Sequence, residues 1–232
     1  SMAYGVIRQG GSSALWIKSD DRFNLSMIMG RKLDTNIQAS LLYTFRSQFA
    51  PGYETRSKDK KISDLLSPGY SIFATGIDFN PNENTTIMLS PLSLKTTFML
   101  DDELANRGAF GVEPAEFDKN GNITKEGENI RNEFGGYFKM NYSKEVIKNV
   151  NFSIDATLFS NYLNNPENID VNLRSVISMK VNKYLSANIA GHLIYDDDID
   201  VPVDNDGDED VDKTGPRTQL KEVIGVSLSF MF

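Results

Sequence analysis

Several residue types and patterns are missing from this chain, and each absence excludes a class of protein. There is no cysteine, which excludes disulfides, thiolate metal sites and cysteine nucleophiles. A single histidine, His192, excludes a metal site built from several histidines. No run of about 18 apolar residues occurs, so no transmembrane helix is predicted. A net charge of -8 argues against nucleic acid as a partner, because a polyanion requires a basic surface.

What the chain does contain is period-two alternation of apolar and polar residues, which is typical of β-strands with two different faces. In "VNFSIDATLFSNY", for example, Phe152, Ile154 and Leu158 alternate with Ser153, Asp155 and Thr157. The pattern predicts an all-β protein with ten strands, at about 2–9, 21–30, 35–49, 69–79, 84–99, 131–142, 148–162, 168–182, 185–196 and 219–232. Pro91 interrupts the fifth strand and is expected at a bulge, because proline cannot donate a ladder hydrogen bond.

The connections between these strands alternate between short turns and long loops. Short segments such as "RKLDT" and "NPNEN" alternate with long ones at about 50–68, 101–130 and 197–218. Outer-membrane barrels have short periplasmic turns and long extracellular loops, and their strands hold about 9–11 residues. We therefore predict an antiparallel up-and-down transmembrane β-barrel, formed by residues 1–232 as a single domain, in a bacterial outer membrane.

The two phases of the alternation assign the side chains to two environments. The polar phase carries charges that would be costly in a dry core, and it is predicted to line a hydrated lumen. Its predicted lumen-lining residues are Arg22, Arg46, Glu133, Lys139, Asp155, Arg174, Lys180 and His192. The last strand, "VIGVSLSFMF", places Ile224, Val226, Leu228, Phe230 and Phe232 in the other phase, predicted to face lipid.

Several longer stretches carry a family resemblance. They include "AYGVIRQGG", "YTFRSQFAPGY", "LSPGYSIFATGIDFNPNEN", "LSPLSLKTTFMLDDELANRGAFGVEP" and "KEVIGVSLSFMF". Together they resemble a Bacteroidetes outer-membrane β-barrel family of unknown function (domain of unknown function 3078). The resemblance supports the location and architecture but implies no catalytic residue and no substrate.

Members of that family look like signal-bearing barrels with further strands upstream of the "AYG" stretch. This sequence is therefore expected to lack its signal peptide and N-terminal strands, with about twelve strands in the full-length protein. The resemblance also implies that the terminal Phe232 is an assembly signal, recognised by the barrel-assembly machinery during insertion.

Two local features of the sequence, His192 and an acidic loop, are candidate sites. His192 shares the polar phase, but no nucleophile and orienting group accompany it, so we expect a hydrogen-bonded filler and not an enzyme. Alternating carboxylates around Gly207 suggest a calcium-binding loop, with Asp204, Asp206, Asp208 and Asp210 as ligands. Pro202 stands where the first ligand of such a loop belongs, and no glutamate closes it. The alternative is a solvated acidic loop without metal, and no other cofactor is predicted.

The sequence leaves three functional hypotheses open. The first is a channel, transport or small-solute binding protein with a polar lumen, embedded in outer-membrane lipid. The second is a non-conducting structural or assembly component, whose extracellular loops dock a protein partner. The third is a soluble β-barrel carrier of an apolar ligand, which requires the phase of Ile224 to point inside.

Overall fold

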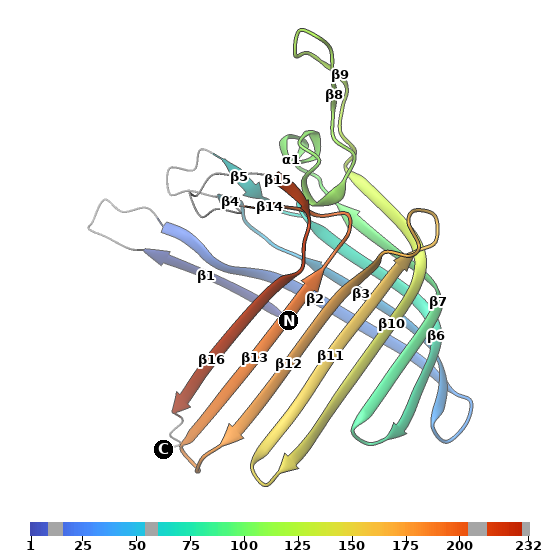
Figure 1. The fold of residues 1–232 in the computed structure, drawn as a ribbon, viewed down its shortest axis with the longest axis vertical. Coiled ribbons are helices and arrows are strands. Elements are labelled where there is room, and N and C mark those ends of the chain that lie inside the picture. The colour runs from blue at the N-terminus through green and yellow to red at the C-terminus, as the bar shows by residue number, and fades with distance from the viewer. Residues whose placement is uncertain (9–15, 54–59, 204–212, 229–232) are drawn as a thin grey trace. The chain divides into compact units, whose positions relative to one another are not determined.

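Antiparallel β-strands make up most of the chain. The computed structural model describes residues 1–8, 16–53, 60–203 and 213–228. Ten strands form one sheet in the order β1-β2-β3-β6-β7-β10-β11-β12-β13-β16 (Figure 1). They are β1 (Met2–Arg8), β2 (Trp16–Lys32), β3 (Ile37–Ser47), β6 (Gly69–Asn82), β7 (Thr85–Phe98), β10 (Ile130–Ile147), β11 (Val150–Asn161), β12 (Ile169–Lys180), β13 (Leu185–Tyr195) and β16 (Gln219–Leu228). The predicted all-β class and ten strands are confirmed.

The remaining elements are short and lie in the three long connections. They are β4 (Gly52–Tyr53), β5 (Lys61–Ser63), α1 (Asp102–Asn106), the 3₁₀ turn η1 (Ala109–Gly111), β8 (Glu116–Phe117), β9 (Ile123–Lys125), β14 (Asp200–Val203) and β15 (Lys213–Pro216). Each strand pair among them forms a small separate hairpin. None of the described helices is long and apolar enough to cross a membrane.

The sheet is a simple meander in which the long strands follow one another in chain order. Among the described residues, β1 pairs only with β2 and β16 pairs only with β13. Both strands are therefore edges of the described sheet, and closure of the predicted barrel is not seen. The chain divides into two compact units: unit 1 is Ser1–Ile28, Leu42–Phe73 and Leu94–Glu133, and unit 2 is Met29–Leu41, Ala74–Ser93 and Phe134–Phe232.

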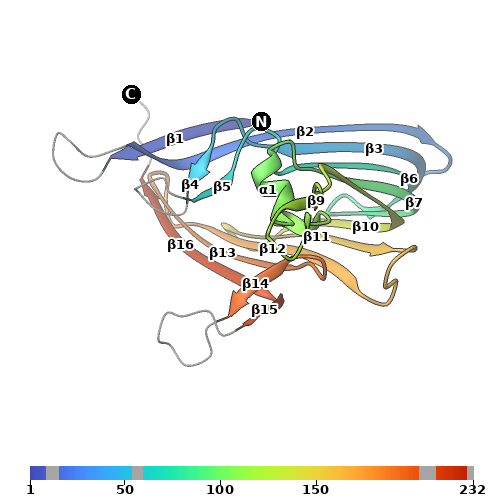
Figure 2. The same cartoon turned by 90° about the horizontal axis from the view of Figure 1, so that it is seen from above.

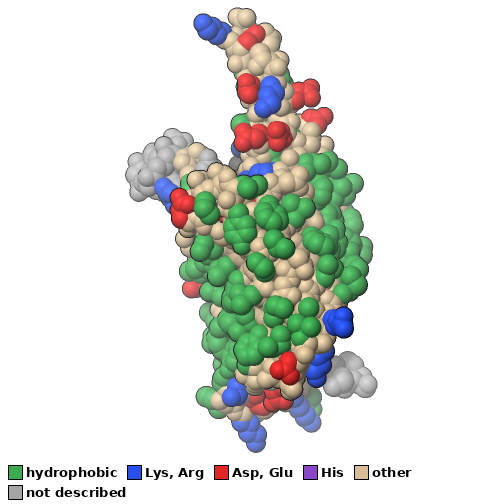
Figure 3. All heavy atoms as spheres, turned by 90° about the vertical axis from the view of Figure 1, so that its right-hand side faces the viewer, with side chains coloured by type: hydrophobic (Ala, Val, Ile, Leu, Met, Phe, Trp, Pro, Cys, Tyr) green, Lys and Arg blue, Asp and Glu red, His purple; other side chains and the backbone are tan. Residues whose placement is uncertain are grey.

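In unit 2, strands β10 to β16 have one polar and one apolar face. Register pairing continues without interruption from Met140 through Ala156, Leu173 and Leu193 to Leu220, all on what we call the apolar face. On β16, the residues of this face include Ile224, Val226 and Leu228, whose exposed fractions are 78%, 69% and 69%. The opposite, polar face carries the other phase of each strand. Figure 3 shows a side of the molecule on which hydrophobic side chains gather between charged ones at its ends.

Strand β7 changes phase at Pro91. Leu89 is exposed and Ser90 buried, but Pro91 and Leu92 are both exposed before Ser93 is buried again. The alternation therefore skips one residue, as a bulge at the proline requires. Gly76 on β6 is needed opposite this point, because a Cβ there would lie 2.0 Å from the carbonyl oxygen of Leu89.

In unit 1, the long connection after β7 has a small core of its own. Met99, Leu104, Ala105 and Val112 are buried together, with Ala109 and Phe110 packed against them. The side chain of Asp101 caps α1 by accepting a hydrogen bond from the backbone N–H of Leu104. Hairpin β8–β9 extends away from α1, as Figure 1 shows, and in its turn the backbone N–H of Asn122 donates to the carboxylate of Asp118.

Candidate functional site

Charged residues of unit 1 neutralise one another and fix its loops. The carboxylate of Glu133 on β10 is 2% exposed and lies 2.7 Å from Nη2 of Arg131 and 3.4 Å from Nζ of Lys95. Arg131 also donates from Nη1 to the carbonyl oxygen of Gly111 at 2.6 Å. The carboxylate of Glu133 thus joins a cation from β7 to a cation from β10. The hydrogen bond from Arg131 to Gly111 ties η1 to these two strands.

A second cluster in unit 1 joins β5 to α1. Nζ of Lys61 lies 2.6 Å from Oδ2 of Asp101 and 3.0 Å from Oδ2 of Asp64. The hydrogen bond to Asp101 raises the pKa of Lys61 above its ordinary value. Burial raises the pKa of Asp101, but hydrogen bonds from Lys61 and from the N–H of Leu104 outweigh it, so this pKa lies below its ordinary value. Both groups therefore stay charged near neutral pH.

A third cluster joins β2 to the segment that contains β4 and β5. Nζ of Lys18 donates to Gln48 Oε1, to the carbonyl oxygen of Ala50 and to Asp21, at 3.0, 2.7 and 3.1 Å. Asp21 in turn accepts from the backbone N–H groups of Phe49 and Ala50. Figure 2 shows β4, β5 and α1 together on one side of β1 and β2. These polar groups of unit 1 hold its loops together.

Two of the predicted lumen-lining residues of unit 1 lie apart from these clusters. Nη2 of Arg22 lies 3.4 Å from Oδ2 of Asp20, and both side chains are exposed. The guanidinium of Arg46 stacks 5.5 Å from the ring centroid of Tyr70. The structure therefore does not bring Arg22, Arg46 and Glu133 into one site.

In unit 2, charged side chains gather on the polar face of β10 to β16. Asn141, Asp155, Arg174, His192 and Lys221 are successive register partners across these five strands. Asn141 donates to the carboxylate of Asp155, and Nε2 of His192 lies 3.0 Å from Oδ1 of Asn172. Arg174 and Lys221 are exposed, and neither forms an ion pair with a described residue. Three of the predicted lumen-lining residues, Asp155, Arg174 and His192, thus share one row.

The neighbouring rows of this face hold the other two predicted residues of unit 2. Lys139 is the register partner of Thr157, one row from Asp155. Lys180 is the register partner of Ser186, nearer to the short turns. The cations of unit 2 thus form an extended polar surface with accessible charge, unlike the neutralised clusters of unit 1.

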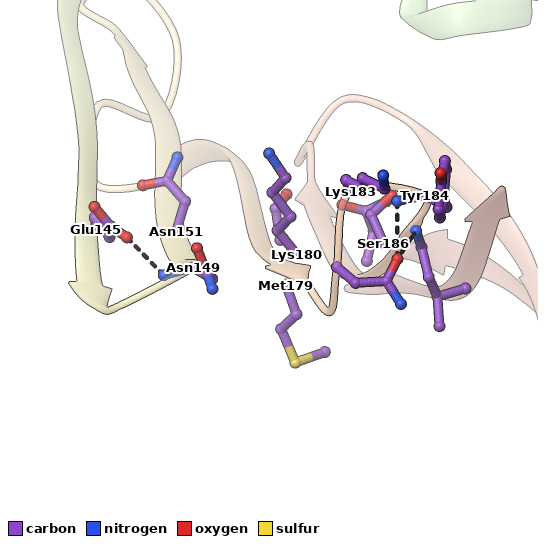
Figure 4. Close-up of a pocket in the computed structure, with 12 residues that line it drawn as sticks. Glu145, Asn149, Asn151, Met179, Lys180, Lys183, Tyr184 and Ser186 are labelled. Carbon is purple, nitrogen blue, oxygen red and sulfur yellow. Dashed lines mark hydrogen bonds between the residues drawn. The ribbon is translucent and has the colours of Figure 1, made fainter. Parts of the chain in front are cut away.

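A pocket of about 740 Å³ opens where this polar face meets the short turns. Its lining comes from β10, β11, β12, β13 and the two turns between them. Figure 4 shows Lys180 and Met179 on opposite sides of β12, and it shows the carboxylate of Glu145 accepting from the backbone N–H of Asn149. Asn151 and Ser186 belong to the same lining.

The structure also reveals polar-face residues that the sequence analysis missed. Asp78 on β6 is 4% exposed and accepts hydrogen bonds from Ser40 Oγ at 2.6 Å and Gln38 Nε2 at 3.1 Å. Its position between the apolar Ile77 and Phe79 was the signal that could have found it. Lys221 on β16 was also missed, although it follows Leu220 of the apolar face and therefore belongs to the polar phase.

Some of the predicted site residues lie outside the part of the chain that the structure describes. The four proposed calcium ligands, Asp204, Asp206, Asp208 and Asp210, lie outside the described residues. Among the residues that are described, no group of three or more His, Asp or Glu side chains could hold a metal ion. Of the predicted lipid-facing residues, Ile224, Val226 and Leu228 are exposed on the apolar face, whereas Phe230 and Phe232 lie outside the described part.

Comparison with protein-family models gives a match over the start of the chain. A family model described as "Protein of unknown function (DUF3078)" matches residues 1–53. No curated protein and no solved structure matches the chain. The match supports the presence of a domain of unknown function at the start of the chain.

Proposed function

We propose that this chain forms a transmembrane β-barrel of a bacterial outer membrane, whose polar face lines a path for the passage or binding of small solutes. The single observation that carries this proposal is the inverted polarity of the sheet. Ile224, Val226 and Leu228 are exposed on the apolar face of β16. In contrast, two polar residues, Ser40 on β3 and Asp78 on β6, are buried. A sheet with such faces is stable when lipid covers the apolar one.

Strand length and order give independent support. Nine of the ten long strands hold between 10 and 18 residues, enough for a tilted strand to cross the hydrocarbon. All small hairpins lie in the three long connections, as expected of extracellular loops.

The same polarity argues against a soluble carrier. A carrier of apolar ligands has to enclose its apolar phase, whereas Leu173, Ile189 and Ile224 are exposed to 36%, 43% and 78%. Water-exposed apolar patches of this extent are uncommon on soluble monomers.

Reconstitution into planar bilayers tests the proposed function. The folded chain is expected to give stepwise ion currents, because the polar face of unit 2 presents exposed charges of both signs, among them Arg174, Lys221 and Asp155. Folded, inserted protein that carries no current and binds no solute would refute the proposal.

One observation favours the non-conducting alternative. Hairpin β8–β9 projects from unit 1 and exposes Phe117 and Ile123, which are register partners, to 58% and 48%. Exposed apolar pairs on a projecting hairpin suit protein docking. Silent but inserted protein that binds a partner only while Phe117 and Ile123 are intact would support this alternative.

A further inference from the structure

The pocket at the short turns of unit 2 has a lining rich in hydrogen-bonding side chains. Seven of its side chains carry an amide or a hydroxyl: Asn149, Asn151, Asn182, Asn188, Ser178, Ser186 and Tyr184. An amide offers donors and an acceptor on one group, and a hydroxyl offers both on one atom. Such a surface matches a ligand whose own groups both donate and accept.

The charged residues around this pocket are largely occupied or balanced. The carboxylate of Glu145 accepts from the N–H of Asn149 at 2.6 Å. Nζ of Lys183 lies 4.7 Å from the ring centroid of Tyr184. Lys180 is then the one lining cation without such a contact among the described residues, and Glu145 borders the same pocket. An anion site would gather several cations and no carboxylate, so this lining favours an uncharged ligand.

The extent of the lining sets the length of the ligand. It runs from Glu145 on β10 to Asn188 on β13, which is three strand spacings or about 14 Å. The volume of about 740 Å³ lies within the range of small-molecule sites. Tyr184, which is 43% exposed, adds an aromatic ring to the lining, and Met179 and Leu185 add aliphatic surface. A long neutral ligand with many hydroxyl groups and some apolar C–H surface fits these features.

We propose that this pocket binds a neutral oligosaccharide. The inference rests on the proposed function, since it names the class of solute that the polar face would take. Sugar hydroxyls would pair with the asparagine and serine side chains, and the C–H face of one ring would lie on Tyr184.

The test is titration of the folded, detergent-solubilised chain with maltohexaose, with gluconate as the anionic comparison, followed by calorimetry. The variant N151A/N188A removes two lining amides from neighbouring parts of the pocket. N141A is the matched control, because it removes an amide from the same polar face outside the pocket. Chemical shifts of the Asn151 and Asn188 side-chain amides in the unmodified chain give a second readout that does not depend on a variant folding.

We expect maltohexaose to bind, to shift these amide signals, and to bind about tenfold more weakly to N151A/N188A than to N141A. The inference is overturned if maltohexaose leaves the amide signals unchanged, if gluconate binds as tightly, or if N141A weakens binding as much as the double variant. Ion currents in planar bilayers without oligosaccharide binding would refute this inference alone. Failure of the chain to insert into vesicles would instead refute the proposed function.

Discussion

Replacing Leu173 by arginine tests whether the apolar face lies against lipid. Leu173 sits near the middle of β12, with Ala156 and Leu193 as its register partners on the same face. Arginine at the midplane of a barrel's lipid face costs about 2–4 kcal/mol of folding free energy. We therefore expect L173R to lower the equilibrium constant for folding into vesicles by about 30- to 700-fold, at about 1.4 kcal/mol per factor of ten.

The matched control is T157R, on the neighbouring strand. Thr157 lies on the polar face, where it is a register partner of Lys139 and Asn172, so its arginine would remain hydrated. T157R should change the free energy of unfolding by about 0.5 kcal/mol or less. Urea titration in phosphatidylcholine vesicles, followed by the fluorescence of the single tryptophan, Trp16, measures both variants. Equal costs for L173R and T157R would refute the assignment of the two faces.

Three further predictions concern stability. E133A should destabilise the chain by about 3–5 kcal/mol, because it leaves the cations of Lys95 and Arg131 together without their carboxylate. In the same urea titration E133Q should cost clearly less, and an equal loss of stability in both variants would contradict this reason. G135A should cost about 1–3 kcal/mol, because its Cβ would lie 2.0 Å from the carbonyl oxygen of Ser160, whereas G225A, with nothing within 4 Å, should be near neutral. The folded pKa of Asp101 is lowered, so its stabilising contribution is present above its ordinary pKa and is lost as the pH falls through the folded value. Protection of the Leu104 amide against hydrogen exchange, corrected for intrinsic rates, should fall as the pH is lowered below the ordinary pKa of an aspartate. D101N should abolish this dependence, and an unchanged profile in D101N would contradict it.

The alternation of residue types was sufficient to predict the ten long strands, because both faces of each strand differ in polarity. The ends were less predictable. The predicted strands at 131–142 and 148–162 leave 143–147 as a turn, but Ser143, Lys144 and Glu145 continue the ladder, and the turn lies at 148–149, where Asn149 has a φ of 66°. Charges in "KSDDR" hid the start of β2, which pairs from Trp16 onward with β1.

The polar clusters were less accessible to sequence reasoning than the strands. Lys95 was missed because the skipped residue at Pro91 reverses the phase of β7, so counting from Leu89 places Lys95 on the wrong face. The bonds from Lys18 to Gln48 and from Lys61 to Asp101 join residues 30 and 40 positions apart. No local pattern encodes such contacts, since they depend on how the loops fold back. The pocket was missed because its amides lie singly on two strands, β11 and β13, and on two turns.

The most direct test of the central claim uses the absence of cysteine, which makes the chain a ready background for single-cysteine labelling. T157C and S178C place a thiol on the polar face, and L173C and I189C place one on the apolar face of the same strands or their neighbours. In vesicles, a water-soluble maleimide should label T157C and S178C rapidly, and it should leave L173C and I189C unlabelled. Labelling of L173C and I189C as fast as T157C would contradict a sheet with water on its polar face and lipid on its apolar face.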